Sequence, residues 1–175
     1  MALSKIGSDA IVNDAIGPNQ LDETANYTFT GTVAGAGGVN TPAFRASRNV
    51  TQNTTDFVQT KVNYPDIVFD TASSYNTSTS TYTIPSGQGG KYFVYACVRC
   101  NGDIDSEVFD LAIRVNNSYA IGYSANQYRY TSNYVAGVLN LSAGDALTVY
   151  VFLGNNIVLR DESGANYFGA YKIIE

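Results

Sequence analysis

The chain has 175 residues, a formal net charge of −5 and no histidine. The negative charge argues against nucleic acid or an anionic membrane as a partner, because both are bound through clustered Lys and Arg. The absence of histidine removes the commonest general base, every Ser-His or Cys-His nucleophile pair and most zinc sites. We therefore expect a protein that is not an enzyme and that has no cofactor.

Apolar residues recur every five positions near the N-terminus, at Ile6, Ile11, Ile16 and Leu21. This spacing fits neither the period of a helix nor that of a strand, and so narrow an apolar stripe cannot bury itself. It must lie against a partner or against copies of itself, unless the segment is a disordered leader. The surrounding sequence resembles short modules of phage tail-fibre and virion-structural proteins, which form the attachment end of trimeric fibres. The resemblance implies that residues 1–33 form an extended segment that binds other virion proteins through these four side chains.

No apolar run has the length of a signal-peptide core or of a membrane span. We therefore expect no signal peptide and no membrane insertion. Together with the resemblance of the N-terminal segment, this predicts a virion component that is assembled in the cytoplasm of the host.

A glycine-rich stretch, residues 34–41, is the predicted linker to the rest of the chain. From residue 42 onward short strand patterns alternate with turn signals, and no helical period occurs. The pattern predicts an all-β domain over residues 42–175, an antiparallel sandwich or jelly roll. The ten predicted strands cover residues 43–49, 56–62, 66–69, 79–84, 91–99, 108–116, 118–124, 133–141, 146–154 and 165–174, with approximate ends.

Three of the predicted strands are apolar on both faces. In residues 91–99, Phe93 and Tyr95 point to one face while apolar side chains also occupy the other, and the strands at 133–141 and 165–174 share this property. An antiparallel sandwich has a single core, so a sheet that is apolar on both faces must be covered on its second face as well. The simplest cover is another subunit.

Five motifs in this part of the chain resemble, in order, the motifs of C1q/TNF-like domains. They are Pro42–Ala46, Phe69–Val94, Leu111–Asn117, Val138–Leu147 and Tyr167–Tyr171. The resemblance implies a ten-stranded C1q/TNF-like jelly roll that assembles as a homotrimer, with one sheet in the strand order A′-A-H-C-F turned toward the three-fold axis.

Strands C, F and H of that sheet are the three strands that are apolar on both faces, which agrees with burial of their second face between subunits. The predicted trimer interface consists of Phe93, Tyr95, Tyr134 and Phe168. The same strand order places the loops at 50–55, 100–107, 125–132 and 159–164 together at the apex, far from the attachment segment.

The apical loop around residue 128 carries the predicted receptor-binding residues Asn126, Tyr128, Arg129 and Tyr130. Flat aromatic faces beside amide and guanidinium donors suit sugar rings and their hydroxyl groups. Exposed tyrosines are also common in any tyrosine-rich β protein, and the chain has fourteen tyrosines, so both interpretations stay open.

Asp103 and Asp105 in another apical loop are calcium candidates, because calcium prefers hard oxygen ligands; solvated loop acids are the alternative. Cys97 and Cys100 are predicted to be buried free thiols. An offset of three along a strand puts their Cα atoms about 10 Å apart on opposite faces, whereas a disulfide needs them within about 7 Å.

These observations together predict a non-enzymatic phage or virus structural protein. It would be a trimeric fibre whose C1q-like head binds a glycan or a protein of the host cell surface. Two alternatives stay open: a capsid or head decoration protein without a receptor role, and a cellular C1q-like glycan-binding module.

Overall fold

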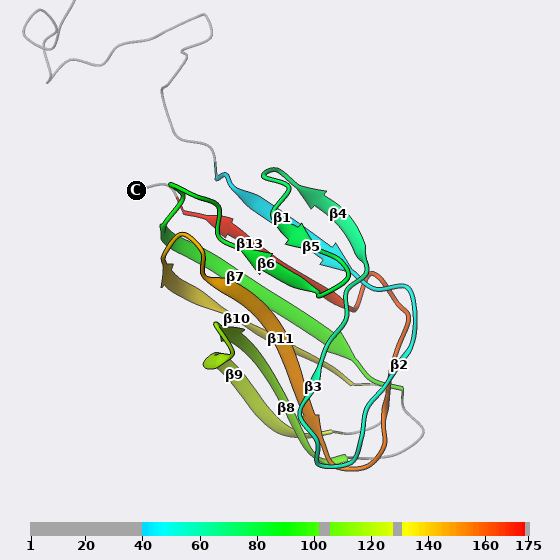
Figure 1. The fold of residues 1–175 in the computed structure, drawn as a ribbon. Coiled ribbons are helices and arrows are strands. Elements are labelled where there is room, and N and C mark those ends of the chain that lie inside the picture. The colour runs from blue at the N-terminus through cyan, green and yellow to red at the C-terminus, as the bar shows by residue number, and fades with distance from the viewer. Residues whose placement is uncertain (1–39, 102–105, 128–130, 174–175) are drawn as a thin grey trace, which may run out of the picture. The chain divides into compact units, whose positions relative to one another are not determined.

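The structure is a computed structural model that describes residues 40–101, 106–127 and 131–173. In these residues the regular elements are β-strands, and most of them belong to two antiparallel sheets that lie one over the other (Figure 1). In the same residues, no helix is long and apolar enough to cross a membrane.

The first sheet has the strand order β10-β7-β13-β1-β4. Its members are β10 (Ser132–Leu141), β7 (Gly90–Arg99), β13 (Tyr167–Lys172), β1 (Ala43–Ser47) and β4 (Asp66–Asp70). The second sheet has the order β5-β6-β11-β8-β9, and β3 (Thr60–Lys61) also pairs with β11. Its other members are β5 (Tyr75–Asn76), β6 (Thr81–Thr83), β11 (Ala146–Leu153), β8 (Ser106–Val115) and β9 (Ser118–Gln127). A small third sheet joins β2 (Gln52–Asn53) to β12 (Val158–Leu159).

The predicted all-β jelly roll is confirmed. Every one of the ten predicted segments contains a strand, and the expected order of strands F, C, H and A appears as β10-β7-β13-β1. The strand predicted at 56–62 is only two residues long, because Phe57 has a φ of 48° and its amide donates to the carbonyl of Leu153 instead of extending a ladder. Three two-residue strands, β2, β5 and β12, were not predicted.

The core lies between the two main sheets and is centred on aromatic rings. Phe44 of β1 stacks on Tyr82 of β6 with ring centroids 4.0 Å apart, and on Tyr75 of β5 at 5.3 Å. Phe168 of β13 meets Phe44 edge-on at 4.9 Å. Such pairs contribute roughly 0.5–1.5 kcal/mol each beyond the burial of their area, so the first and second sheets are joined at this cluster.

The prediction that Phe168 belongs to a trimer interface is wrong. Its side chain is fully buried in the core of its own protomer. The cause is the register of β13 against β7, in which Phe168 pairs with the core residue Ala96, while Tyr171 pairs with Phe93. Directly opposed residues share a face of the sheet, so Phe168 and Phe93 point in opposite directions.

Both cysteines are buried thiols that form no disulfide, as predicted. Cys100 is in the core, whereas Cys97 pairs with Tyr134 and Tyr167 on the other face of the first sheet. Their offset of three positions therefore separates them across the sheet.

The described parts of the apical loops are joined to one another. Cys100 forms an isolated bridge with Leu159, and β2 pairs with β12. The fully buried Arg48 donates from Nε and Nη2 to the carbonyl of Val50 and from Nη1 to Gln52. This side chain therefore ties the chain after β1 to β2 at the apical end.

Candidate interaction surfaces

The outward-facing side chains of the first sheet form a surface that we call the aromatic face. It consists of Phe93, Tyr95, Tyr134, Val138, Tyr167 and Tyr171. Three rows cross strands β10, β7 and β13 in order: Val138–Phe93–Tyr171, Ala136–Tyr95–Gly169 and Tyr134–Cys97–Tyr167. The alternation of β7 explains this face, because Tyr92, Val94, Ala96 and Val98 fill the core and leave the intervening side chains on the outside.

The rings of the aromatic face pack against one another. The centroid of Phe93 lies 5.5 Å from that of Tyr171 and 6.0 Å from that of Tyr95. Tyr95 and Tyr167 form an edge-to-face pair at 6.0 Å. The guanidinium carbon of Arg45 lies 4.6 Å from the ring centroid of Tyr167, within the range of a cation–π contact. The face is therefore preorganised in the single protomer.

Gly169 makes room for Tyr95 on this face. A Cβ at Gly169 would lie 2.4 Å from the Tyr95 hydroxyl oxygen and 2.8 Å from the carbonyl oxygen of Phe44. The tyrosine ring thus lies directly against the backbone of β13. A larger residue at position 169 would push the Tyr95 ring away from the sheet.

The aromatic face is partly exposed, and its own six side chains are uncharged, with the guanidinium of Arg45 beside them. Tyr134 and Val138 expose 48% and 55% of their surface in the protomer. Burial raises the pKa of the Tyr95 and Tyr167 hydroxyls and of the Cys97 thiol above their ordinary values. These groups keep their protons at neutral pH, which leaves an apolar and aromatic surface of the kind found at protein interfaces.

Strand β4, at the other edge of the first sheet, also carries exposed apolar side chains. Ile67, Val68 and Phe69 are all exposed, and Phe69 pairs with Arg45 of β1. An edge strand with large exposed apolar side chains is a site for contact with another chain.

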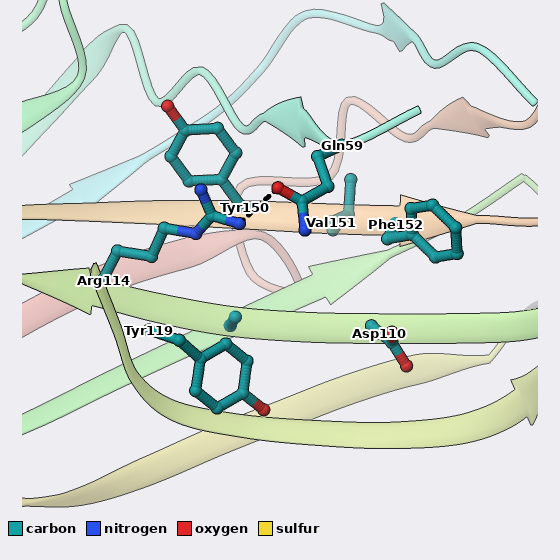
Figure 2. Close-up of a pocket in the computed structure, with 8 residues that line it drawn as sticks. Gln59, Asp110, Arg114, Tyr119, Tyr150, Val151 and Phe152 are labelled. Atoms are coloured by element: carbon teal, nitrogen blue, oxygen red, sulfur yellow. Dashed lines mark hydrogen bonds between the residues drawn. The ribbon is translucent and has the colours of Figure 1, made fainter. Parts of the chain in front are cut away.

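A second surface lies on the outer face of the second sheet, where a pocket is formed by residues of β8, β9 and β11 and by the chain before β3. Figure 2 shows the side chains that surround it. The pocket is lined by Gln59, Asp110, Ala112, Arg114, Tyr119, Tyr150, Val151 and Phe152. Arg114 reaches across β11, where its guanidinium carbon lies 4.2 Å above the ring centroid of Tyr150 and its Nη2 donates to Oε1 of Gln59.

Several known structures have a similar fold, and three of them are from animals. The globular domain of the zebrafish complement 1qA protein has a TM-score of 0.54 and 18% identity, and the alignment covers 77% of this chain and 98% of that one. Eiger TNF from S. frugiperda has a TM-score of 0.59 and 18% identity, with coverage of 76% and 92%. Murine APRIL has a TM-score of 0.60 and 17% identity, with coverage of 75% and 98%.

The chain has the C1q/TNF-like jelly-roll fold. No protein-family model and no curated protein sequence matches it. At these identities the likeness concerns the fold alone, so the interaction surfaces have to be judged from the residues of this chain.

Within the C1q/TNF-like fold, three of the four predicted interface residues lie together. Phe93, Tyr95 and Tyr134 are on the aromatic face, and Phe168 is in the core. Sequence reasoning did not place Tyr167 and Tyr171 on this face. Both belong to the same strand as Phe168, but to the set of side chains that points away from the core. Only the cross-strand register shows which of the two alternating sets points outward.

The structure does not describe the side chains of the other predicted site residues. Ile6, Ile11, Ile16 and Leu21, the calcium candidates Asp103 and Asp105, and the receptor-binding candidates Tyr128, Arg129 and Tyr130 lie outside the described residues. Asn126 lies in β9, and only its backbone is described. Their roles stay predictions. Among the residues that the structure does describe, no group of three or more Cys, Asp or Glu side chains could hold a metal ion.

Proposed function

We propose that this chain is a non-enzymatic structural protein of a phage or virus, a homotrimeric fibre whose C1q/TNF-like head binds the host cell surface. Residues 1–33 would anchor it to other virion proteins, and the aromatic face of the first sheet would form the trimer contact. The observation that carries the assembly is that this sheet is apolar on both faces, with one face in the core and the other outside the protomer.

The aromatic face has the properties of a self-association surface. Tyr134 and Val138 lie on β10, the edge strand of the first sheet, and are about half exposed in the protomer. Their neighbours Phe93 and Tyr171 are already packed in a fixed arrangement, so little side-chain entropy is lost when a second copy covers them. Interface cores are enriched in aromatic residues and depleted of charged ones, and this face matches that composition.

The pocket of the second sheet suits binding better than hydrolysis. A glycosidase needs two carboxyl groups about 5–9.5 Å apart across one cleft. The residues that line the pocket include a single carboxyl group, that of Asp110.

The mass of the protein in solution tests the trimer. The wild-type chain should have the mass of three copies of the 18.8-kDa protomer, measured by light scattering after size-exclusion chromatography. Val138→Asp should be monomeric and folded, because it puts a charge on the aromatic face and removes nothing from the core. Val58→Asp is the matched control, since Val58 is 49% exposed and is not part of that face; it should remain trimeric. A wild-type chain that is monomeric at micromolar concentration would overturn the proposed assembly.

The location of the protein in intact virions tests the biological role. Antibodies against the head domain should label the outside of the particle, and a chain that lacks residues 1–33 should still trimerise but should no longer be incorporated. The free trimer should also compete with particles for adsorption to host cells. Labelling without competition would favour the decoration protein, and absence from particles would favour the cellular C1q-like module.

A further inference from the structure

The pocket on the outer face of the second sheet has a flat aromatic floor. Tyr119 exposes 65% of its surface, yet its ring lies against the backbone of β9. A Cβ at Gly122 would fall 1.5 Å from the Tyr119 hydroxyl oxygen and 2.2 Å from Cζ, so the ring occupies the space above this glycine. One ring face is pressed onto the sheet and the other is open. Gly122 also pairs with Ala112, so no larger side chain rises between Tyr119 and the middle of the pocket.

Polar atoms of the pocket lack partners in the protein. Oδ1 of Asp110 and Nε of Arg114 are buried and make no hydrogen bond. A buried polar atom without a partner costs roughly 1–3 kcal/mol, more if it is charged, and native proteins contain few of them. These two atoms are covered by the protein, but both side chains line the pocket, Asp110 as an acceptor and Arg114 as a donor. A ligand that contacts both side chains must offer donors and acceptors. Hydroxyl groups offer both.

The two groups are too far apart for a small ion to meet both. Asp110 and Arg114 stand on the same face of β8 with Ala112 between them, and four residues along a strand span about 13 Å between Cα atoms. The remaining wall is aromatic, with Tyr150 and Phe152 from β11 beside Gln59 (Figure 2). A ligand that lies across this shallow pocket and reaches both groups therefore has flat apolar faces as well as several hydroxyl groups along its length.

The charges of the pocket favour an uncharged ligand. The carboxylate of Asp110 opposes an anion such as a sialic or uronic acid. The positive charge of Arg114 opposes a cation, and its guanidinium group is already stacked on Tyr150 and hydrogen-bonded to Gln59. An ion attracted by one of these two charges would therefore be repelled by the other.

We propose that this pocket binds a neutral saccharide of about two hexose units, with a sugar ring stacked on Tyr119 and hydroxyl groups bound to Asp110 and Arg114. The assignment rests on the proposed host-surface role for its biological meaning, but its geometry is independent of the aromatic face. It differs from the predicted receptor-binding residues at the apex, since it uses the outer face of β8, β9 and β11.

The test measures binding of the full-length chain to an array of immobilised neutral hexose oligosaccharides, each placed beside its sialylated or uronate-containing counterpart. We expect binding to a subset of the neutral glycans, and at least fivefold weaker binding to their acidic counterparts. The affinity for the free neutral disaccharide is then measured by saturation-transfer NMR. Tyr119→Ala and Asp110→Ala should each weaken it at least tenfold. Gly122→Ala, which displaces the Tyr119 ring without removing it, should have an effect of the same direction.

The matched control is Tyr123→Ala. Tyr123 is an exposed tyrosine of the same strand, but it pairs with the core residue Leu111 and so stands on the other face of the second sheet. Its replacement should change the affinity less than twofold. Thermal unfolding of each variant confirms that it is folded, and Tyr119→Ala is safe in this respect because the side chain is mostly exposed.

Three results would overturn the assignment: no glycan bound, binding of acidic glycans alone, or binding that Tyr119→Ala leaves intact. None of them changes the mass of the trimer or its place on the virion, so failure of this assignment is distinct from failure of the proposed function. If the wild-type chain is monomeric and still binds the neutral disaccharide, the proposed trimer is wrong and the saccharide site is supported.

Discussion

Phe168→Ala should destabilise the protomer, whereas Tyr134→Ala should weaken the proposed trimer and leave the protomer stable. Phe168 is fully buried and touches Phe44, Tyr64 and Tyr75 at centroid distances of 4.9, 5.9 and 6.4 Å. Replacing a buried Phe by Ala removes its transfer free energy and leaves a cavity, at a cost of about 3–5 kcal/mol. Tyr134 exposes 48% of its surface in the protomer, and substitutions at such positions usually change protomer stability by about 0.5 kcal/mol or less.

The two effects are separated best in a monomeric background. In the Val138→Asp chain, we expect Phe168→Ala to lower the free energy of unfolding by about 3–5 kcal/mol, measured by urea titration. Tyr134→Ala should leave that free energy within about 0.5 kcal/mol. In the wild-type background Tyr134→Ala should raise the dissociation constant of the trimer, measured by light scattering over a dilution series.

Phe168→Leu provides the control for side-chain volume, and it should cost less than Phe168→Ala because most of the cavity stays filled. The reasoning from register fails if Phe168→Ala leaves the monomer as stable as its parent while it dissociates the trimer. That result would mean that β13 presents its other face to the core.

Three further predictions follow from buried groups. Gly169→Ala should lower protomer stability by about 1–3 kcal/mol in thermal unfolding, because the new Cβ meets both the Tyr95 hydroxyl and the carbonyl oxygen of Phe44, and the backbone atom cannot move aside; an unchanged melting temperature would contradict this. Arg48→Ala should cost about 2–3 kcal/mol in urea unfolding, since the carbonyl of Val50 loses its charged donor, and a neutral result would show that water replaces the guanidinium. Burial raises the pKa of Tyr75 from 10.0 to about 12, so the unfolded chain loses this proton first as the pH rises, and stability should be constant below about pH 10 and fall between pH 10 and 12. Denaturant midpoints measured across that interval, with tyrosinate absorbance as the second signal, should show the fall; a constant midpoint up to pH 12 would refute it.

Local patterns were sufficient for most of the fold. In the strand at 108–116, Phe109, Leu111 and Ile113 alternate with Asp110, Ala112 and Arg114, and the structure buries the first three. The short strands β2 and β12 were missed because each has only two residues and is stabilised by the other, more than 100 positions away in the sequence. Pairing over such a distance leaves no periodicity in either segment.

The outward face of the first sheet was harder to predict than the strands themselves. When a strand is apolar on both faces, alternation gives two sets of side chains but not the direction of either. Phe93 and Tyr95 were assigned correctly to the outside because a family resemblance supplied the direction for β7. For β13 no comparable signal existed, and only the pairing of Phe93 with Tyr171 shows that Phe168 points inward.

The second-sheet pocket was not predicted at all. Gln59, Tyr119 and Tyr150 come from three separate parts of the sequence, and they meet because β3, β11, β8 and β9 pair side by side in that order. A partial signal was present, since Gly122 interrupts an otherwise β-favouring run and a glycine within a strand often marks a close approach. Here the approaching group is the ring of Tyr119.

The two surfaces belong to different sheets of the protomer, and this separation has a consequence for binding. A trimer closed through the aromatic face of the first sheet leaves the pocket of the second sheet uncovered in every copy. The pocket encloses about 40 Å³, far less than a typical small-molecule site of about 300–1,000 Å³, so it is a shallow depression and a single saccharide contact is expected to be weak. Three linked copies acting on one dense glycan layer can raise the apparent affinity by roughly 10²–10⁴-fold without any new contact. The monomeric Val138→Asp chain must then keep the wild-type affinity for a free disaccharide and lose retention on a glycan-coated surface. If both properties persist in the monomer, trimerisation serves the stability of the fibre and contributes nothing to recognition.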